Sequence, residues 1–139
     1  MFSWHLEEDS SSKHIFTISP NGDSKLLSIS KKIIRAAPNL SEWKFRYCLP
    51  PKKWNFKFEA YDNFMLKQQF DASKWEYVLL EKRNRHVKIL IKATNIATLD
   101  TDDQIQAARM VVTNILGEED VIDFVDFLLF LTVLHVGRL

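Results

Sequence analysis

The sequence predicts an α+β fold, in which one mainly antiparallel sheet of about five to seven strands carries two amphipathic helices packed on one face. Two segments repeat apolar residues near the helical period, between clear start and stop signals. Several others alternate apolar and polar residues with the period of two that a half-buried strand shows. The 139 residues are 46% hydrophobic and 27% charged, with few Gly and Pro, which is typical of an ordered globular chain.

A chain of this length fits one domain, and we expect residues 1–139 to form one. Residues 1–12 are expected to be an N-terminal tail or a short strand, and residues 13–134 the core.

Residues 14–19 are β-branched or aromatic and end in a Pro-Asn-Gly-Asp turn, which predicts a strand. Asp23 or Ser24 is expected to cap the helix that follows. Pro38 ends this helix because proline cannot continue its hydrogen bonds. The apolar positions predict a buried stripe of Leu26, Ile29 or Ser30, Ile33, Ile34 and Ala37.

Residues 43–49 and 54–60 alternate aromatic with other residues on either side of Pro50-Pro51. They predict two half-buried strands that are close enough in sequence to pair antiparallel. Residues 62–73 are ambiguous, with a short strand at 65–70 as one alternative. Residues 75–81 and 86–92 flank a polar turn and predict a hairpin.

A second helix is expected to begin at the capping box formed by Thr101 and Gln104. Its predicted buried stripe comprises Ile105, Ala108, Val112, Ile115 and Leu116, and Gly117 follows as a left-handed stop. Residues 118–120 could add one short helical turn. Residues 124–133 favour a final strand over a buried helix, because Phe and Val are frequent and no cap follows.

Charge is segregated along the chain although the net charge is only +1. Basic residues dominate from 25 to 57, and acidic residues dominate from 99 to 126. Such asymmetry indicates an interaction face, or two solvated surfaces that neutralise each other. The candidate interaction face is the polar side of the first helix, with Lys25, Lys31, Lys32 and Arg35.

The alternation of cations with aromatics over residues 43–58 suggests a nucleic-acid-binding domain as an alternative function. Its candidate residues are Lys44, Arg46, Lys52 and Lys53. Against it, a strand places alternate side chains on opposite faces, whereas a base-stacking surface needs aromatics and cations on the same face.

No motif for a nucleophile, a phosphate-binding loop or a dinucleotide site is present in the sequence. The four histidines are dispersed without metal-ligand spacing, so neither a metal nor a cofactor is expected. A small enzyme with a pocket near Asp102 or His86 stays as a further alternative. Cys48, the single cysteine, is expected to be a buried strand thiol in a reducing compartment.

The N-terminus lacks the pattern of a signal peptide, which favours the cytoplasm. The apolar run at 127–136 is too short to span a membrane, and we expect no membrane association.

Three stretches, residues 16–23, 36–43 and 114–118, contain a Gly-Asp turn, Ala-Pro-x-Leu-x-x-Trp and Leu-Gly-Glu, in this order. In these stretches the chain resembles a family of small, uncharacterised bacterial proteins. The resemblance covers about residues 14–130 and implies an α+β domain without an assigned activity, so it supplies no site residues.

The favoured interpretation is therefore a non-catalytic binding or protein-interaction module. Its expected partner is an unidentified protein, with a homodimer as one alternative form.

Overall fold

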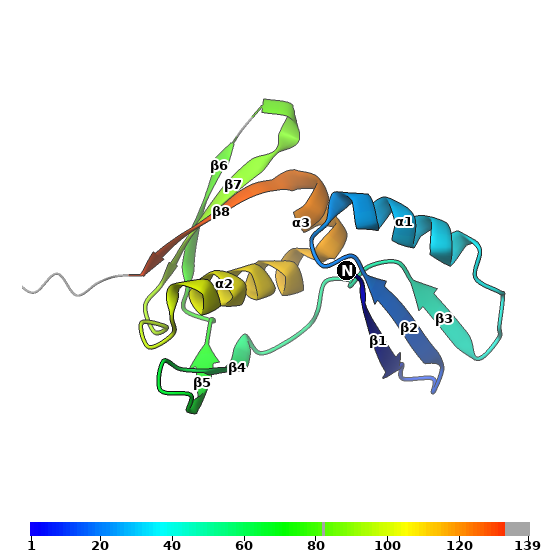
Figure 1. Cartoon of the computed structure of the whole chain (residues 1–139), viewed down its shortest axis with the longest axis horizontal. Helices are drawn as coiled ribbons and strands as arrows, with labels where there is room; N and C mark the ends of the chain where they lie inside the picture. Colours follow the sequence, from blue (N-terminus) through cyan, green and yellow to red (C-terminus); the bar gives the residue numbers. More distant parts are fainter. Residues whose placement is uncertain (82, 133–139) are drawn as a thin grey trace, which may run out of the picture. The chain divides into compact units, whose positions relative to one another are not determined.

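The computed structural model describes residues 1–81 and 83–132, and over these it contains three helices, one 3₁₀ turn and eight strands (Figure 1). The predicted α+β class is confirmed. The single sheet of about five to seven strands is wrong, because the strands form separate sheets of three, two and three. Three of the five strand pairings are antiparallel. Within the described part of the chain, no helix combines the length and apolar character needed to cross a membrane.

Contacts within the chain divide it into two compact units. The first comprises Met1–Lys52 and Leu116–Asp123, and the second comprises Lys53–Ile115 and the chain from Phe124. The two predicted helices lie mainly in different units, so they do not share one sheet face. That residues 1–139 fold as one cooperative domain stays a prediction.

The first unit contains a three-stranded sheet in the order β1-β2-β3. β1 (Ser3–Glu8) pairs antiparallel with β2 (His14–Ser19), so the N-terminal segment is a strand. β3 (Trp43–Arg46) pairs parallel with β2, and α1 (Ser24–Arg35) forms the crossover between them. A helical connection of this kind is what parallel neighbours require.

α1 begins where the sequence predicts, with the Asp23 carboxylate accepting hydrogen bonds from the N–H groups of Lys25 and Leu26. Its buried stripe differs from the predicted one. Leu27 and Ser30 are buried, whereas Ile29 and Ile33 are 44% and 43% exposed. The alternative Ser30 is thus the inward residue in place of Ile29, and Leu26, Ile34 and Ala37 of the predicted stripe are half-buried.

The second unit contains two small sheets. The strands β4 (Lys57–Tyr61) and β5 (Lys67–Asp71) form an antiparallel hairpin, so the strand considered at 65–70 exists. The antiparallel pairing predicted between 43–49 and 54–60 is wrong, since β3 and β4 belong to different sheets. Alternation marks each segment as a strand but does not specify its partner, and β4 pairs with β5, which follows it directly in sequence.

The other sheet of this unit has the order β6-β7-β8. β6 (Glu76–Glu81) and β7 (Val87–Ala93) form the predicted hairpin, with the 3₁₀ turn η1 (Arg83–Arg85) in its connection. β8 (Val125–Thr132) confirms the predicted final strand and pairs parallel with β7. Residue 133 of the predicted strand and residues 133–136 of the apolar run lie outside the described residues.

α2 (Thr101–Leu116) and α3 (Glu118–Phe124) connect β7 to β8. Both three-stranded sheets therefore follow one topology: a hairpin, then a helical crossover to a parallel strand. This repeat was invisible in the sequence because topology carries no fixed residue pattern.

The start of α2 differs from the predicted capping box. The Asp100 carboxylate, and not Thr101, accepts a hydrogen bond from the N–H of Asp103 at 2.8 Å. The Gln104 amide instead donates to the carbonyls of Ile96 and Leu99, at 3.2 and 2.9 Å. Asp competes well with Thr as a helix cap, which explains the shift by one residue. Gly117 ends the helix at a φ of 85°, as predicted.

The core of the second unit forms where the β4–β5 hairpin meets α2 and the segment before it. Its buried residues are Phe70, Ala93, Ile96, Leu99 and Ala107, with Phe58, Ala60 and Trp75 packed against them. Phe58 stacks on Phe70 at a ring-centroid distance of 5.5 Å. This core fixes the hairpin and α2 relative to each other within the unit.

Candidate functional site

The connection between β4 and β5 is a tight turn built around the buried side chain of Asp62. One carboxylate oxygen, Oδ1, accepts hydrogen bonds from the N–H groups of Phe64 and Leu66, both at 2.9 Å. The other, Oδ2, accepts from the Gln68 amide at 3.0 Å. Hydrogen bonds from the Leu66 N–H, the Gln68 side chain and the Phe64 N–H hold the pKa of Asp62 below its usual value. The turn is therefore fixed by a carboxylate that stays ionised at neutral pH.

Backbone contacts fix the same turn further. The Asp62 N–H donates to the Leu66 carbonyl at 2.9 Å, and the Met65 N–H donates to the Asp62 carbonyl at 3.0 Å. Met65 has a φ of 63°, in the left-handed region that most residues avoid. Such a conformation persists when surrounding interactions impose it, as they do here.

This rigid turn exposes apolar side chains. Phe64 is 80% exposed, Met65 77% and Leu66 59%. Single exposed apolar residues are common, but a consecutive group on a fixed turn is typical of a binding surface. The turn lies beside a cleft of about 440 Å³ in the same unit.

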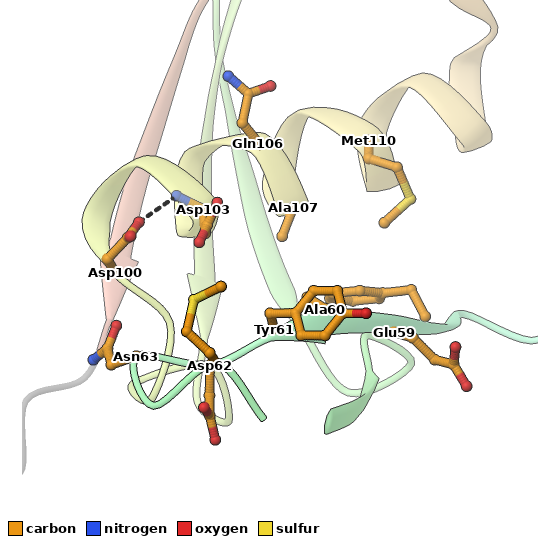
Figure 2. A pocket seen from close by; sticks show the side chains of 12 residues that line it. Glu59, Ala60, Tyr61, Asp62, Asn63, Asp100, Asp103, Gln106, Ala107 and Met110 are labelled. Carbon is orange, nitrogen blue, oxygen red and sulfur yellow. Dashed lines mark hydrogen bonds between the residues drawn. The ribbon is translucent and has the colours of Figure 1, made fainter. Parts of the chain in front are cut away.

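The cleft runs between β4 and α2, from the start of the helix to Met110 (Figure 2). Asp100 and Asp103 lie at one end and Met110 at the other, and Tyr61 lines the cleft from β4. Its lining consists of Phe58, Glu59, Ala60, Tyr61, Asp62, Asn63, Met65, Asp100, Asp103, Gln106, Ala107 and Met110. We call this lining, together with Phe64 and Leu66, the tip–cleft surface.

Hydrogen bonds hold the walls of the cleft in place. The Asn63 N–H donates to the Thr98 carbonyl at 2.9 Å, which ties the turn to the segment before α2. The Asn95 amide donates to the Asp71 carbonyl at 2.9 Å, so this segment is also tied to the end of β5. A binding surface on such a framework is formed before its ligand arrives.

The charge of the cleft is negative. Its lining includes the carboxylates of Glu59, Asp62, Asp100 and Asp103, and none of the described lining residues is Lys, Arg or His. Glu59 forms an ion pair with Lys67 at 2.7 Å, and Asp62 is occupied by the turn. Asp100 and Asp103 add two carboxylates where α2 begins, and that of Asp100 also caps the helix.

A second cleft, of about 380 Å³, lies in the first unit around Tyr47, Cys48 and Glu119. The Glu119 carboxylate accepts a hydrogen bond from the Tyr47 hydroxyl at 2.7 Å and forms an ion pair with Lys31 at 2.8 Å. Lys31 and then Tyr47 lower the pKa of Glu119, and Glu119 raises the pKa of both partners. This cluster ties α1, α3 and the segment after β3 together, which is a structural role.

Cys48 lines the second cleft but differs from its prediction. It is half-buried and follows the end of β3, because that strand stops at Arg46 and not at residue 49. Burial, with the nearby charges of Glu119 and Glu118, raises the pKa of the thiol to about 11. The thiol is therefore protonated at neutral pH and a poor nucleophile.

The structure divides the predicted interaction face of the first helix. Lys25, Lys32 and Arg35 are exposed, whereas Lys31 is half-buried in the ion pair with Glu119. Lys31 is therefore less accessible than the other three, because its ammonium group pairs with Glu119.

The residues of the nucleic-acid alternative do not form one patch with the aromatics of β3. Lys44 is exposed, and Arg46 is half-buried with its guanidinium 3.8 Å from Glu7. Lys52 and Lys53 are exposed in the connection between β3 and β4. Because side chains alternate along a strand, Lys44 and Arg46 lie on the face opposite Trp43 and Phe45.

The face of the first sheet that carries Trp43 and Phe45 is aromatic and partly exposed. Trp4 is 74% exposed and meets Phe16 edge to face at a centroid distance of 6.2 Å. Phe16 meets Phe45 at 6.4 Å. We call Trp4, Leu6, Phe16, Trp43 and Phe45 the aromatic sheet face.

The two residues of the enzyme alternative lie outside both clefts. Asp102 is exposed on the first turn of α2. His86 Nδ1 lies 2.6 Å from Asp126 Oδ1. Within residues 1–81 and 83–132, no three His, Cys, Asp or Glu side chains form a group that could hold a metal ion.

Sequence reasoning missed the tip–cleft surface. The Asp62-Asn63 pair, followed by Phe64-Met65-Leu66, gives a signal for a turn that Asp initiates. The apolar run after it was instead considered as the start of a strand, since exposure cannot be read from residue type.

The exposed apolar features thus include the aromatic sheet face, residues 77–80 of β6 and the tip–cleft surface. The tip–cleft surface also has a cleft and a charge. The chain matches no protein-family model, no curated protein and no solved structure, so the family resemblance of residues 14–130 stays a prediction.

Proposed function

We propose that the chain is a non-catalytic protein-interaction module of the cytoplasm that binds its partner through the tip–cleft surface. The observation that carries the proposal is the exposure of Phe64, Met65 and Leu66 on a turn fixed by Asp62. Holding apolar side chains in water brings no stability to the free chain. A partner that covers them recovers this free energy without having to order the turn.

The chemistry of the cleft agrees with binding. Its described lining offers carboxylates, one phenol, amides and thioethers, but no serine, cysteine, histidine or lysine. Among the side chains that serve as nucleophiles or bases, carboxylates act best when their pKa values are strongly separated by burial or by like charge. The carboxylate of Asp62 has the opposite environment, because hydrogen bonds lower its pKa.

Site-specific photo-crosslinking tests the proposal in cells that express the full chain. A photoreactive phenylalanine replaces Phe64, and in separate chains Tyr77 or Trp4, which are also highly exposed aromatics at 69% and 74%. We expect position 64 to give one discrete protein adduct, and positions 77 and 4 to give little of it. Mass spectrometry identifies the adduct.

The Asp62→Ala change supplies the control, because it loosens the turn and leaves the exposed residues in place. We expect it to reduce the adduct at position 64 by about tenfold, as the loss of a central binding contact does. Circular dichroism establishes that the variant is folded. No protein adduct at position 64, or an equal adduct with and without Asp62, would contradict the proposal.

A further inference from the structure

We infer that the partner presents a basic segment with apolar side chains, and that this segment lies in the cleft between β4 and α2. The inference rests on the proposed function and names the chemistry of the partner at the same surface. It combines three properties of the cleft: its apolar floor, its charge and its size.

The floor of the cleft is apolar and adaptable. Phe58, Ala60, Tyr61, Met65 and Met110 contribute to it from β4, the turn and α2. Methionine side chains are flexible and polarisable, so they fit apolar side chains of differing shape. Two of them at one cleft are typical of a surface that receives a peptide side chain.

The negative charge of the cleft favours a partner segment of positive charge. Asp100 and Asp103 lie at one end of it (Figure 2). No cation of the described residues forms an ion pair with either carboxylate. A segment with Lys or Arg beyond its apolar side chains would place a cation beside these carboxylates, whereas an acidic segment would be repelled.

The size of the cleft favours a chain segment over a small ligand. A volume of about 440 Å³ holds a few side chains, and the cleft is open along one side. Phe64 and Leu66 flank the lining residue Met65 in sequence and are exposed, and a small cation in the cleft would leave them uncovered. A segment that crosses the cleft covers both.

Fluorescence anisotropy with a defined probe tests the inference on the full chain. The probe is a labelled peptide of Leu and Lys at helical spacing, compared with the same peptide carrying Glu for Lys and with one carrying Ser for Leu. We expect the Leu/Lys peptide to bind and both altered peptides to bind at least about tenfold more weakly. Binding of the Leu/Lys peptide should weaken as salt is raised.

Two variants at the start of α2 test whether the cleft carboxylates attract the peptide. Asp100→Asn with Asp103→Asn removes both cleft carboxylates, and the Asn side chain can still cap the helix. We expect this pair of changes to weaken binding about tenfold. Asp102→Asn removes an exposed acid from the same helical turn outside the cleft, and we expect less than about a twofold change.

Several outcomes would overturn the inference. Equal binding by the Asp100→Asn/Asp103→Asn variant would place the peptide elsewhere. Equal binding of the Ser-substituted peptide, with displacement by spermidine, would assign the cleft to small cations. Self-association of the chain that is lost both in the Asp100→Asn/Asp103→Asn variant and in Lys32→Glu would assign the cleft to a second copy. The protein crosslinked at position 64 could instead contact the chain through a neutral or acidic segment. That result would overturn the inference of a basic segment and leave the proposed function standing.

Discussion

Replacing Glu118 with alanine is expected to lower the free energy of unfolding by about 3 kcal/mol, because three buried or half-buried hydrogen bonds lose their acceptor together. Glu118 is only 4% exposed. Its Oε1 accepts from the Ser19 hydroxyl at 2.6 Å and from the Asn21 N–H at 2.9 Å. Its Oε2 accepts from the Leu49 N–H at 2.8 Å. The single carboxylate therefore joins the end of β2, the start of α3 and the segment after β3.

Urea unfolding measures this loss, and two further variants interpret it. Glu118→Gln keeps one oxygen acceptor, but its NH₂ group replaces the other oxygen and faces a hydrogen-bond donor. We therefore expect a loss of unfolding free energy smaller than that of Glu118→Ala. Asp120→Ala removes an exposed acid from the same helical turn, and we expect about 0.5 kcal/mol. A Glu118→Ala loss no greater than that of Asp120→Ala would show that these hydrogen bonds do not support the first unit.

Replacing Gly117 with alanine is expected to cost about 2–5 kcal/mol, from two causes that add. Its φ of 85° is left-handed, which costs a residue with a Cβ about 1–2 kcal/mol. A Cβ at this position would also lie 2.8 Å from Pro51 Cδ and 3.1 Å from the Pro51 backbone nitrogen. Forcing extra atoms into a packed site typically costs about 1–3 kcal/mol more.

Gly22 offers a matched control for the backbone cost alone. Its φ is 80°, and nothing lies within 4 Å of an added Cβ. Gly22→Ala should therefore cost about 1–2 kcal/mol by thermal or urea unfolding. Adding Pro51→Ala to Gly117→Ala should recover part of the difference, since it removes the nearest ring carbon. An equal cost at Gly117 and Gly22 would contradict the contact with Pro51.

The signals that begin and end the helices could be read from the sequence. Asp23 caps α1 and Gly117 ends α2, because side-chain capping and positive φ depend on single residues with strong preferences. The hairpin of β6 and β7 was also readable, since two segments rich in apolar residues flank a short polar turn. The separation into three sheets was not, because pairing between distant strands leaves no mark on either strand alone.

The candidate site shows a similar division. The sequence indicated charge segregation, and Asp100 and Asp103 belong to the acidic part that it marked. The ion pair of Lys31 could not be predicted, because its partner Glu119 is distant in sequence. Nor could the exposure of Phe64, which depends on how Asp62 closes the turn. Both depend on tertiary contacts that composition and periodicity do not encode.

The central claim, that the tip–cleft surface is the binding surface, is tested most directly by nuclear magnetic resonance. Backbone amide shifts of the full chain are followed while the Leu/Lys peptide is added. The account predicts progressive shifts at Tyr61–Met65 and along α2 from Asp103 to Met110, with the amides of Trp4, Phe16 and Phe45 unchanged. Shifts confined to the aromatic sheet face, with those of the turn and α2 unmoved, would contradict it.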